Sequence, residues 1–259
     1  MKVSIILPLF EASLALAAYQ CPVMPQAPGL AIQYAYTIQT LMQEYYFSVP
    51  VNTTFFSDLP NATAISPING MTLAENTVTN VNGLTKQAEL GSEALRQFWG
   101  SYDSTSLSYC HYNLPAAATG LDHLKMAYFF EASLCGAFIG LAEVVQAPQA
   151  AFLMARLAAE HGVHASAIRG MMQAVGFHAN STSLLPAFAP STVLMSNGSR
   201  EVGMLGSFLG GCASAPPNPC NGTIVIGPLL AELNDQMSGN AYTPMPVSMP
   251  MPATSTPTM

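Results

Sequence analysis

The sequence predicts an all-α protein built around an antiparallel four-helix bundle. Apolar residues recur at alternating spacings of three and four along several long stretches, which is the pattern of packed helices. Prolines lie at the ends of these stretches, and the connection between the last two is so short that it makes them antiparallel neighbours. With 259 residues, the chain can bury one large core, so we expect one main domain at residues 29–177.

The N-terminus has the pattern of a secretory signal peptide at residues 1–17. Lys2 supplies a positive charge, residues 3–10 form an apolar run, and Ala15 and Ala17 flank Leu16 in the small-x-small pattern of a cleavage site. Glu11 interrupts the apolar region, so an ordinary first helix remains the alternative. The pattern predicts a protein that is secreted to the extracellular space or cell wall, with residues 18–28 as a short segment before the bundle.

Five Asn-x-Ser/Thr sequons support secretion, because each lies among turn-forming residues where an N-linked glycan can attach. The formal net charge is −7, so the chain has no basic stripe with which to neutralise phosphates, and nucleic acid is not an expected partner. The five asparagines are Asn52, Asn61, Asn180, Asn197 and Asn221.

The first helix is expected at residues 29–47 and the second at residues 72–102. The first places Tyr34, Ile38, Leu41 and Tyr45 along one seam. The second has an apolar seam beside a polar stripe that contains Glu89 and Ser92. That stripe is either a solvated helix face or a face that turns Glu89 toward an interior site. The apolar seam comprises Val81, Leu84, Ala88, Leu95 and Phe98.

The third helix is expected at residues 121–146 and the fourth at residues 149–175, with Pro148 in the turn between them. Residues 126–145 are apolar enough to suggest a membrane span, but Glu131, Glu143 and the amphipathic spacing argue against one. The seam of the fourth helix contains His161 and His164, which project from one face about one turn apart.

Glu131, in the third helix, and His161 and His164 therefore occupy core-facing positions, although only 8% of the residues are charged. Ionisable groups at such positions need a partner or a metal. One interpretation is a metal site inside the bundle. The other is a buried glutamate that is hydrogen-bonded to histidine without a metal.

Five cysteines leave at least one thiol unpaired in an oxidising compartment, and Cys135 is the expected free one because it lies on the third helix's seam. Cys212 and Cys220 flank a proline-rich loop and could pair with each other, while Cys21 could pair with Cys110. Crossed pairing between these two sets remains open.

Beyond the bundle, residues 178–237 are rich in glycine and proline, and we expect them to wrap irregularly around it. Residues 238–259 are rich in proline, serine, threonine and methionine, a composition that cannot bury a core. This tail is expected to be disordered or extended.

Four segments carry specific motifs: Cys-His-Tyr-Asn-Leu-Pro at 110–115, Phe-Glu-Ala at 130–132, the segment 158–169, and the first helix at 34–46. Together they resemble the secreted fungal ferritin-like family, which includes proteins of stress response and late sexual development. The resemblance covers about residues 30–175 and implies a ferritin-like four-helix bundle. Related metal-binding members surround two metals with a carboxylate from each of two helices and a Glu-x-x-His from each of the other two.

This resemblance also implies where the ligands should lie, and the chain departs from the pattern. The first helix offers Gln39, the second Glu89-x-x-Ser92, and the fourth His161-x-x-His164, with Glu160 adjacent. Two divalent metals need several carboxylates to offset their repulsion, so a complete di-iron site is not expected.

The remaining set is expected to hold one iron, zinc or manganese ion through Glu131, His161 and His164, with Glu89 as a further ligand or supporting group. Tyr45 is a candidate hydrogen-bonding group beside the site, whereas His123 is expected at the surface or a helix cap. The alternative is an extracellular structural or interaction protein that has lost the metals. Hydrolase and nucleotide-binding motifs do not occur, and a homo-oligomer remains open.

Overall fold

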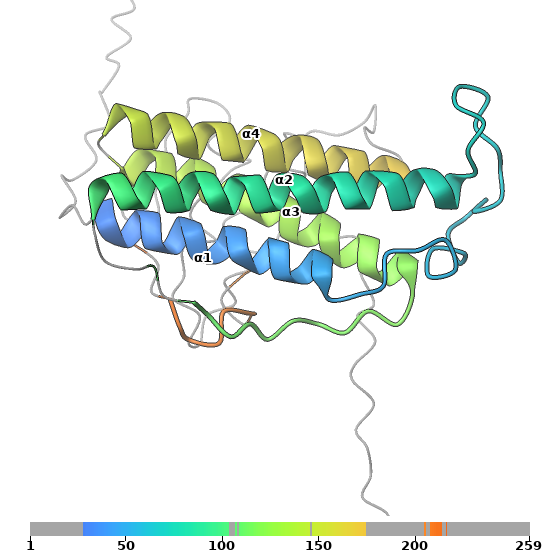
Figure 1. The fold of residues 1–259 in the computed structure, drawn as a ribbon, viewed down its shortest axis with the longest axis horizontal. Helices are drawn as coiled ribbons and strands as arrows, with labels where there is room; N and C mark the ends of the chain where they lie inside the picture. The colour runs from blue at the N-terminus through green and yellow to red at the C-terminus, as the bar shows by residue number, and fades with distance from the viewer. Residues whose placement is uncertain are drawn as a thin grey trace, which may run out of the picture.

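The computed structural model describes residues 28–103, 107, 109–145, 147–174, 205, 208–213 and 216. Four long helices lie side by side in these residues (Figure 1): α1 (Pro28–Phe47), α2 (Leu73–Tyr102), α3 (Gly120–Val144) and α4 (Pro148–Met171). The main pairings are α1 with α2 and α3 with α4, and contacts between α1 and α3 and between α2 and α4 join the two pairs. The predicted all-α four-helix bundle is confirmed.

Local sequence explains where the helices begin. Thr72 caps α2 through a capping box, in which its hydroxyl accepts from the Glu75 amide while the Glu75 carboxylate accepts from the Thr72 amide. The Thr119 side chain accepts from the Asp122 amide at the start of α3. Pro148 occupies the first turn of α4, where an amide hydrogen would have no helical partner.

The fourth helix ends at Met171, four residues before the predicted end. Met172 is its C-cap, and Gln173 adopts a left-handed conformation with φ of 54°. The Gln173 amide bonds to the Gly170 carbonyl and the Ala174 amide to the Arg169 carbonyl, which closes the helix with a tight turn. A periodic apolar pattern does not reveal such a turn, because Val175 continues the pattern past the break.

The core is mainly apolar and includes large aromatic side chains such as Tyr34, Phe56 and Phe138, but a smaller set of polar and charged side chains is buried in it as well. Residues 120–142 form one helix that is long and apolar enough to cross a membrane, but most of this stretch is buried inside the bundle. It is therefore the core helix of the bundle, and the expectation that it does not span a membrane is confirmed.

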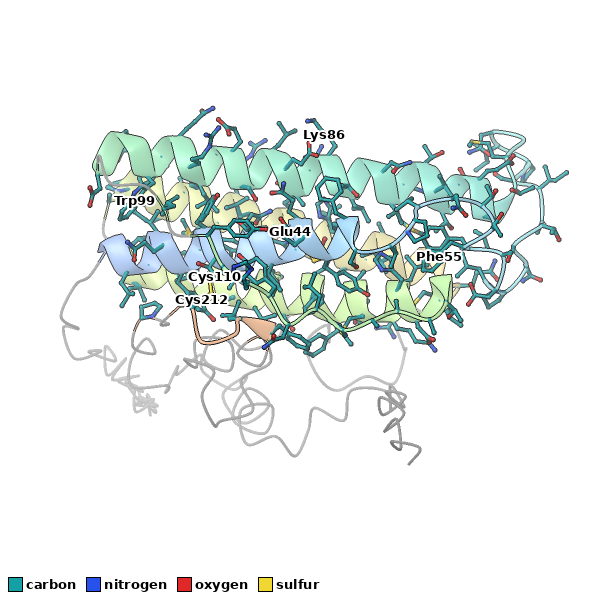
Figure 2. All side chains as sticks on the ribbon, turned by 60° about the horizontal axis from the view of Figure 1, so that its bottom comes forward. Glu44, Phe55, Lys86, Trp99, Cys110 and Cys212 are labelled. Carbon is teal, nitrogen blue, oxygen red and sulfur yellow. A yellow bond between two sulfur atoms is a disulfide. The ribbon has the colours of Figure 1, made fainter. Side chains whose placement is uncertain are left out.

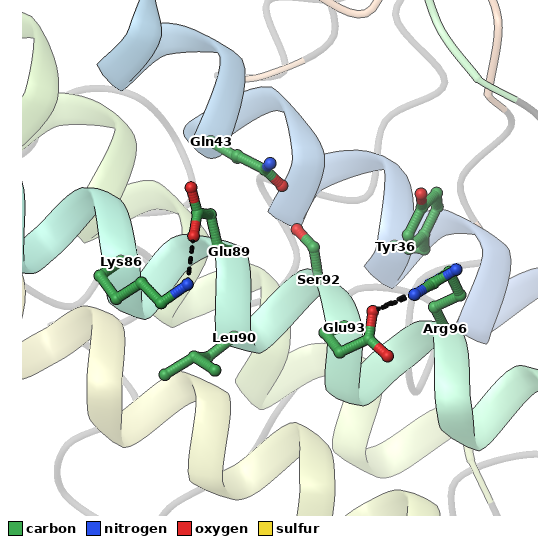
Figure 3. Close-up of a pocket in the computed structure, with 8 residues that line it drawn as sticks. All are labelled: Tyr36, Gln43, Lys86, Glu89, Leu90, Ser92, Glu93 and Arg96. Atoms are coloured by element: carbon green, nitrogen blue, oxygen red, sulfur yellow. Dashed lines mark hydrogen bonds and ion pairs between the residues drawn. The ribbon is translucent and has the colours of Figure 1, made fainter.

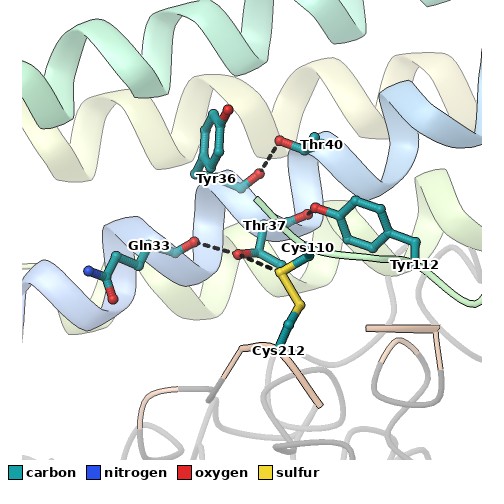
Figure 4. The surroundings of a disulfide bond; sticks show 7 residues. All are labelled: Gln33, Tyr36, Thr37, Thr40, Cys110, Tyr112 and Cys212. Atoms are coloured by element: carbon teal, nitrogen blue, oxygen red, sulfur yellow. Dashed lines mark hydrogen bonds between the residues drawn. A yellow bond between two sulfur atoms is a disulfide. The ribbon is translucent and has the colours of Figure 1, made fainter. Parts of the chain in front are cut away.

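A disulfide joins Cys110 to Cys212, which is one of the crossed pairings that the sequence left open and replaces the suggested pairing of Cys212 with Cys220 and of Cys110 with Cys21. It lies against α1 (Figures 2 and 4), where the Cys110 sulfur is 4.0 Å from the Thr37 hydroxyl. Spacing along the chain could not show this pairing, because 102 positions separate the bonded cysteines. Cys135 is free and buried, as predicted.

The short segment around Cys212 also packs on the bundle. Leu205 and Leu209 are fully buried, and the Phe208 ring meets Phe130 edge to face with centroids 4.8 Å apart. The Phe208 carbonyl accepts a hydrogen bond from the Asn113 amide. This segment therefore completes the apolar core beside α3.

Two of the five sequon asparagines lie in the connection between α1 and α2, and both Asn52 and Asn61 are exposed. The Asn61 amide nitrogen donates to the Gln173 side chain at 2.9 Å. Residues 1–27, which contain the predicted signal peptide and Cys21, lie outside the described residues. So do Asn180, Asn197, Asn221, Cys220, the residues 238–259 and most of the segment 178–237.

Candidate metal centre

Three side chains with metal-ligating groups meet in the core between α3 and α4. They are Glu131 from α3 and His161 and His164 from α4, and one ligand atom from each lies within 4.8 Å of the others. Glu131 and His161 are fully buried, and His164 is 7% exposed. The helical seams place them there, since residues three apart in α4 project from the same face toward a neighbouring helix.

The Glu131 carboxylate bonds three partners through its two oxygens. Oε2 lies 2.5 Å from His161 Nδ1, while Oε1 accepts from the Tyr46 hydroxyl at 2.5 Å and lies 3.3 Å from His164 Nδ1. Such charge-assisted hydrogen bonds are the strong ones in a water-excluded interior. The carboxylate is thus held in one orientation by α1 and α4 together.

The other side of His161 is fixed as well. His161 Nε2 lies 2.8 Å from Gln39 Oε1, and the Gln39 amide nitrogen donates to the Ala88 carbonyl at 3.4 Å. Both neighbours of the imidazole are therefore oxygens, one from a carboxylate and one from an amide. The ring also stacks on Phe138, with centroids 5.2 Å apart and planes 6° from parallel. His161 is thus held in one orientation between the Glu131 carboxylate and the Gln39 amide.

Burial and pairing act in opposite directions on the titration of these groups. Burial alone would raise the pKa of Glu131, but the charge and hydrogen bond of His161, with those of His164, lower it to about 2. Burial likewise opposes the charged form of His164, yet its hydrogen bond to Glu131 and the charges of Glu131 and Glu160 raise its pKa above the usual 6.5. Burial and the adjacent Glu131 raise the pKa of Tyr46 well above 10. The cluster therefore keeps an ionised carboxylate and a neutral phenol.

Glu89, predicted as a further ligand, lies away from the cluster. It sits on the outer side of α2 in an ion pair with Lys86 at 2.6 Å (Figure 3). The core-facing positions of α2 are Ala88 and Gly91, which come one residue before Glu89 and Ser92 respectively. A Cβ at Gly91 would lie only 2.5 Å from the Gln39 amide nitrogen, so Gln39 fills the space on that side of His161. The bundle therefore has no carboxylate or imidazole from α2 at this level.

Glu160 is also outside the three-residue cluster, although it lies close enough to His164 to influence its pKa. It is partly buried, and its Oε1 has no hydrogen-bond partner among the described residues. One residue corresponds to about 100° around a helix, so Glu160 cannot share the direction of His161. Glu160 adds negative charge beside the cluster rather than a ligand within it.

Two further residues differ from expectation. Tyr46, rather than Tyr45, bonds the Glu131 carboxylate, while the Tyr45 hydroxyl donates to the His123 carbonyl at 3.1 Å. His123 is fully buried rather than at the surface, and its ring stacks on Tyr45 with centroids 4.6 Å apart. Position near a helix start suggested exposure, but residues 48–72 cover this end of the bundle, and Phe55 and Phe56 meet the His123 ring edge to face.

The donor set suits one metal ion. Bonds from nitrogen or oxygen ligands to such an ion are about 2 Å long, so two ligands of one ion lie about 3 Å apart. The 3.3 Å between Glu131 Oε1 and His164 Nδ1 matches this spacing. The 2.5 Å hydrogen bond between Glu131 Oε2 and His161 Nδ1 must open slightly and lose its proton when an ion binds.

The donor set does not suit two metal ions. Gln39 replaces a carboxylate, Ala88 and Gly91 supply no ligand, and the described residues contain one carboxylate in the cluster. Two neighbouring divalent ions would then be left with little negative charge between them.

Comparison with protein families identifies the ferritin-like domain over residues 30–174, which is more than half of the chain. Comparison with curated proteins and with solved structures gives no match. The matched residues begin near the start of α1 and end just after α4, so they include nearly all of the bundle and all three residues of the buried cluster.

Proposed function

The chain belongs to the ferritin-like domain family, and from this premise we propose that its bundle binds one divalent metal ion through Glu131, His161 and His164. The observation that carries the proposal is the convergence of these three buried side chains. Charged groups are rarely placed in a core without a partner or a metal, and the chain is only 8% charged.

Two imidazoles and one carboxylate are donors that suit iron, zinc and manganese. Such an ion would supply Lewis acidity, and iron or manganese would add one-electron chemistry. The chain's own residues would orient the ligands: Tyr46 holds Glu131 through its hydroxyl, and Gln39 holds His161 through its amide oxygen. The proposal concerns metal binding and specifies no reaction.

We further propose that the protein is an extracellular glycoprotein, as the signal-like N-terminus and the sequons suggest. The Cys110–Cys212 disulfide supports this location, because such bonds persist in oxidising compartments. Asn52 and Asn61 are exposed and so are accessible for glycosylation. The loss of mass on treatment with an amide-cleaving glycosidase tests this part of the proposal.

A second candidate is a structural or interaction protein that has kept the bundle and lost its metals. The closed hydrogen-bond network favours it, because each ring nitrogen of His161 and each oxygen of Glu131 already has a partner. Buried polar groups that are fully satisfied in this way occur in cores without metals. Metal binding distinguishes the two candidates.

An anaerobic titration tests the proposal. Full-length protein, stripped of metal, is titrated with ferrous, zinc and manganese ions by calorimetry, and we expect one ion to bind per chain with release of protons. The Glu131→Gln variant keeps the shape of the side chain but removes its charge, so its affinity should fall at least tenfold. The Glu89→Gln variant should bind as the native protein does. If no ion binds, the second candidate is correct, and if two bind, the assignment of the site is wrong.

A further inference from the structure

A cavity of about 380 Å³ that is open to solvent lies on the outer side of the bundle, between α1 and α2 (Figure 3). It is separate from the buried cluster, since its lining residues are Tyr36 and Gln43 from α1 and a run of α2 side chains from Lys86 to Arg96. The volume is in the lower part of the range for small-molecule sites. It is sufficient for a ligand with about a dozen non-hydrogen atoms.

Ser92 is the feature that points to a ligand. It is 7% exposed, and its Oγ is buried without a hydrogen-bond partner among the described residues. Figure 3 shows this hydroxyl directed from α2 toward Gln43 of α1, inside the cavity. A buried hydroxyl without a hydrogen-bond partner lowers the stability of the fold. Because the Ser92 hydroxyl faces a cavity, we infer that a bound ligand supplies its hydrogen-bond partner.

The charges around Ser92 cancel. Lys86 pairs with Glu89 on one side of the hydroxyl, and Arg96 pairs with Glu93 on the other. A charged ligand would have to compete with one of these ion pairs, whereas a neutral ligand can bond the free lone pairs and hydrogens of both. The cavity therefore favours a neutral, hydrogen-bonding ligand.

The remaining groups indicate many hydroxyls on that ligand. The Gln43 amide presents one donor beside one acceptor, and Glu89 has a second carboxylate oxygen beside the one that pairs with Lys86; such neighbouring polar atoms match pairs of adjacent hydroxyls. Glu93 contributes less, because one of its oxygens accepts from Arg96 and the other from Gln97. The Tyr36 ring lines the cavity and supplies an apolar face for carbon-bound hydrogens. We propose that this cavity binds a neutral polyhydroxylated ligand of monosaccharide size, with the Ser92 hydroxyl at its centre.

Saturation-transfer NMR on the full-length protein, after removal of any N-linked glycans, tests this proposal. The probes are the methyl glycosides of glucose, mannose, galactose and N-acetylglucosamine, and inorganic phosphate serves as the charged probe. We expect at least one glycoside to bind and phosphate not to bind. The affinity should fall about two- to tenfold in Ser92→Ala and in Gln43→Ala, because each loses one or two hydrogen bonds.

Ser101→Ala is the matched control, since Ser101 is an exposed serine of the same helix whose hydroxyl bonds its own helix at the Phe98 carbonyl. It should leave the affinity unchanged. The proposal is overturned if no glycoside binds, if both cavity variants bind as tightly as the native protein, or if phosphate binds in preference. Ser92→Ala removes an unpaired hydroxyl and should not unfold the protein, and a thermal melt checks this. The test does not depend on metal binding.

Discussion

The bundle buries histidines in two places, and their surroundings are opposite: one place is polar and the other is aromatic. His161 lies between two oxygens, from Glu131 and Gln39, and its partner Glu131 is an ionised carboxylate. His123, eight residues before Glu131 on α3, lies among aromatic rings, and neither ring nitrogen has a hydrogen-bond partner among the described residues. Two adjacent tyrosines of α1 contact the two places. The Tyr46 hydroxyl donates to Glu131 in the charged cluster, and the Tyr45 ring stacks on His123. Burial alone therefore does not distinguish the two histidines, whereas their hydrogen-bond partners do.

The largest expected effect comes from breaking the charged cluster on one side. His161→Leu would leave the Glu131 carboxylate buried without its main partner, and such a loss costs about 3–5 kcal/mol. Replacing Glu131, His161 and His164 by Leu together with Tyr46→Phe removes the charges at once and should cost much less, since apolar replacement of a whole buried ion pair is often neutral.

Chemical denaturation of the metal-free variants measures both free energies of unfolding. His111→Leu is a control, because His111 is exposed and outside the cluster. A single variant that is as stable as the native protein would show that the carboxylate is not charged in the folded state.

The second effect is the dependence of stability on pH, which differs in sign between the two histidine sites. Burial lowers the pKa of His123 to about 4 from 6.5, so the unfolded chain binds the proton more readily than the folded protein does. Stability from this group is complete above pH 6.5 and is lost as the pH falls to 4, by about 3 kcal/mol. The raised pKa of His164 has the opposite sign, since its contribution is lost as the pH rises above 6.5 through the folded pKa.

His123→Phe should therefore flatten the dependence of stability on pH between 6.5 and 4, because it removes a group that cannot accept a proton in the folded protein. Denaturation at several pH values measures the slope. Glu131 titrates at lower pH, with its contribution lost between about 4.5 and 2, so the two windows are nearly separate. An unchanged slope in His123→Phe would contradict the unpaired environment of this ring.

The smallest effect concerns the support of His161. Gly91→Ala would place a methyl group 2.5 Å from the Gln39 amide nitrogen and 3.3 Å from Leu157, so we expect a loss of about 1–3 kcal/mol and a weaker hold on His161. Gly83→Ala in the same helix meets nothing within 4 Å and should stabilise the protein by about 0.5–1 kcal/mol. Thermal melts compare the two. Equal effects would show that Gln39 moves aside freely.

The sequence could predict much of the cluster, because helical periodicity decides which side chains face the core. It placed Glu131, His161 and His164 on core-facing seams, and the structure brings these three residues together. The polar stripe of α2 alone did not show which face of that helix turns inward. Ala88 and Gly91 continue the apolar seam, however, and this pattern favours the interpretation that Glu89 lies on a solvated face.

Other features depend on contacts between distant parts of the chain. The bond from Tyr46 to Glu131 joins residues 85 positions apart, and the Cys110–Cys212 disulfide joins residues 102 positions apart. Two adjacent tyrosines on α1 differ by about 100° in direction, and only the packing of α1 on α3 shows which one meets the carboxylate. His123 is buried by a loop whose path has no periodic pattern.

The central claim is that the charged cluster is a metal site, and its most direct test is the metal content of the protein. Protein secreted from a eukaryotic host and purified without a chelator or a metal-affinity tag is measured by elemental mass spectrometry, beside the His161→Gln/His164→Gln variant. We expect close to one iron, zinc or manganese ion per native chain and a loss of that ion in the variant. A native protein without metal, even after anaerobic incubation with each of the three ions, would contradict the claim and make the cluster a structural ion pair.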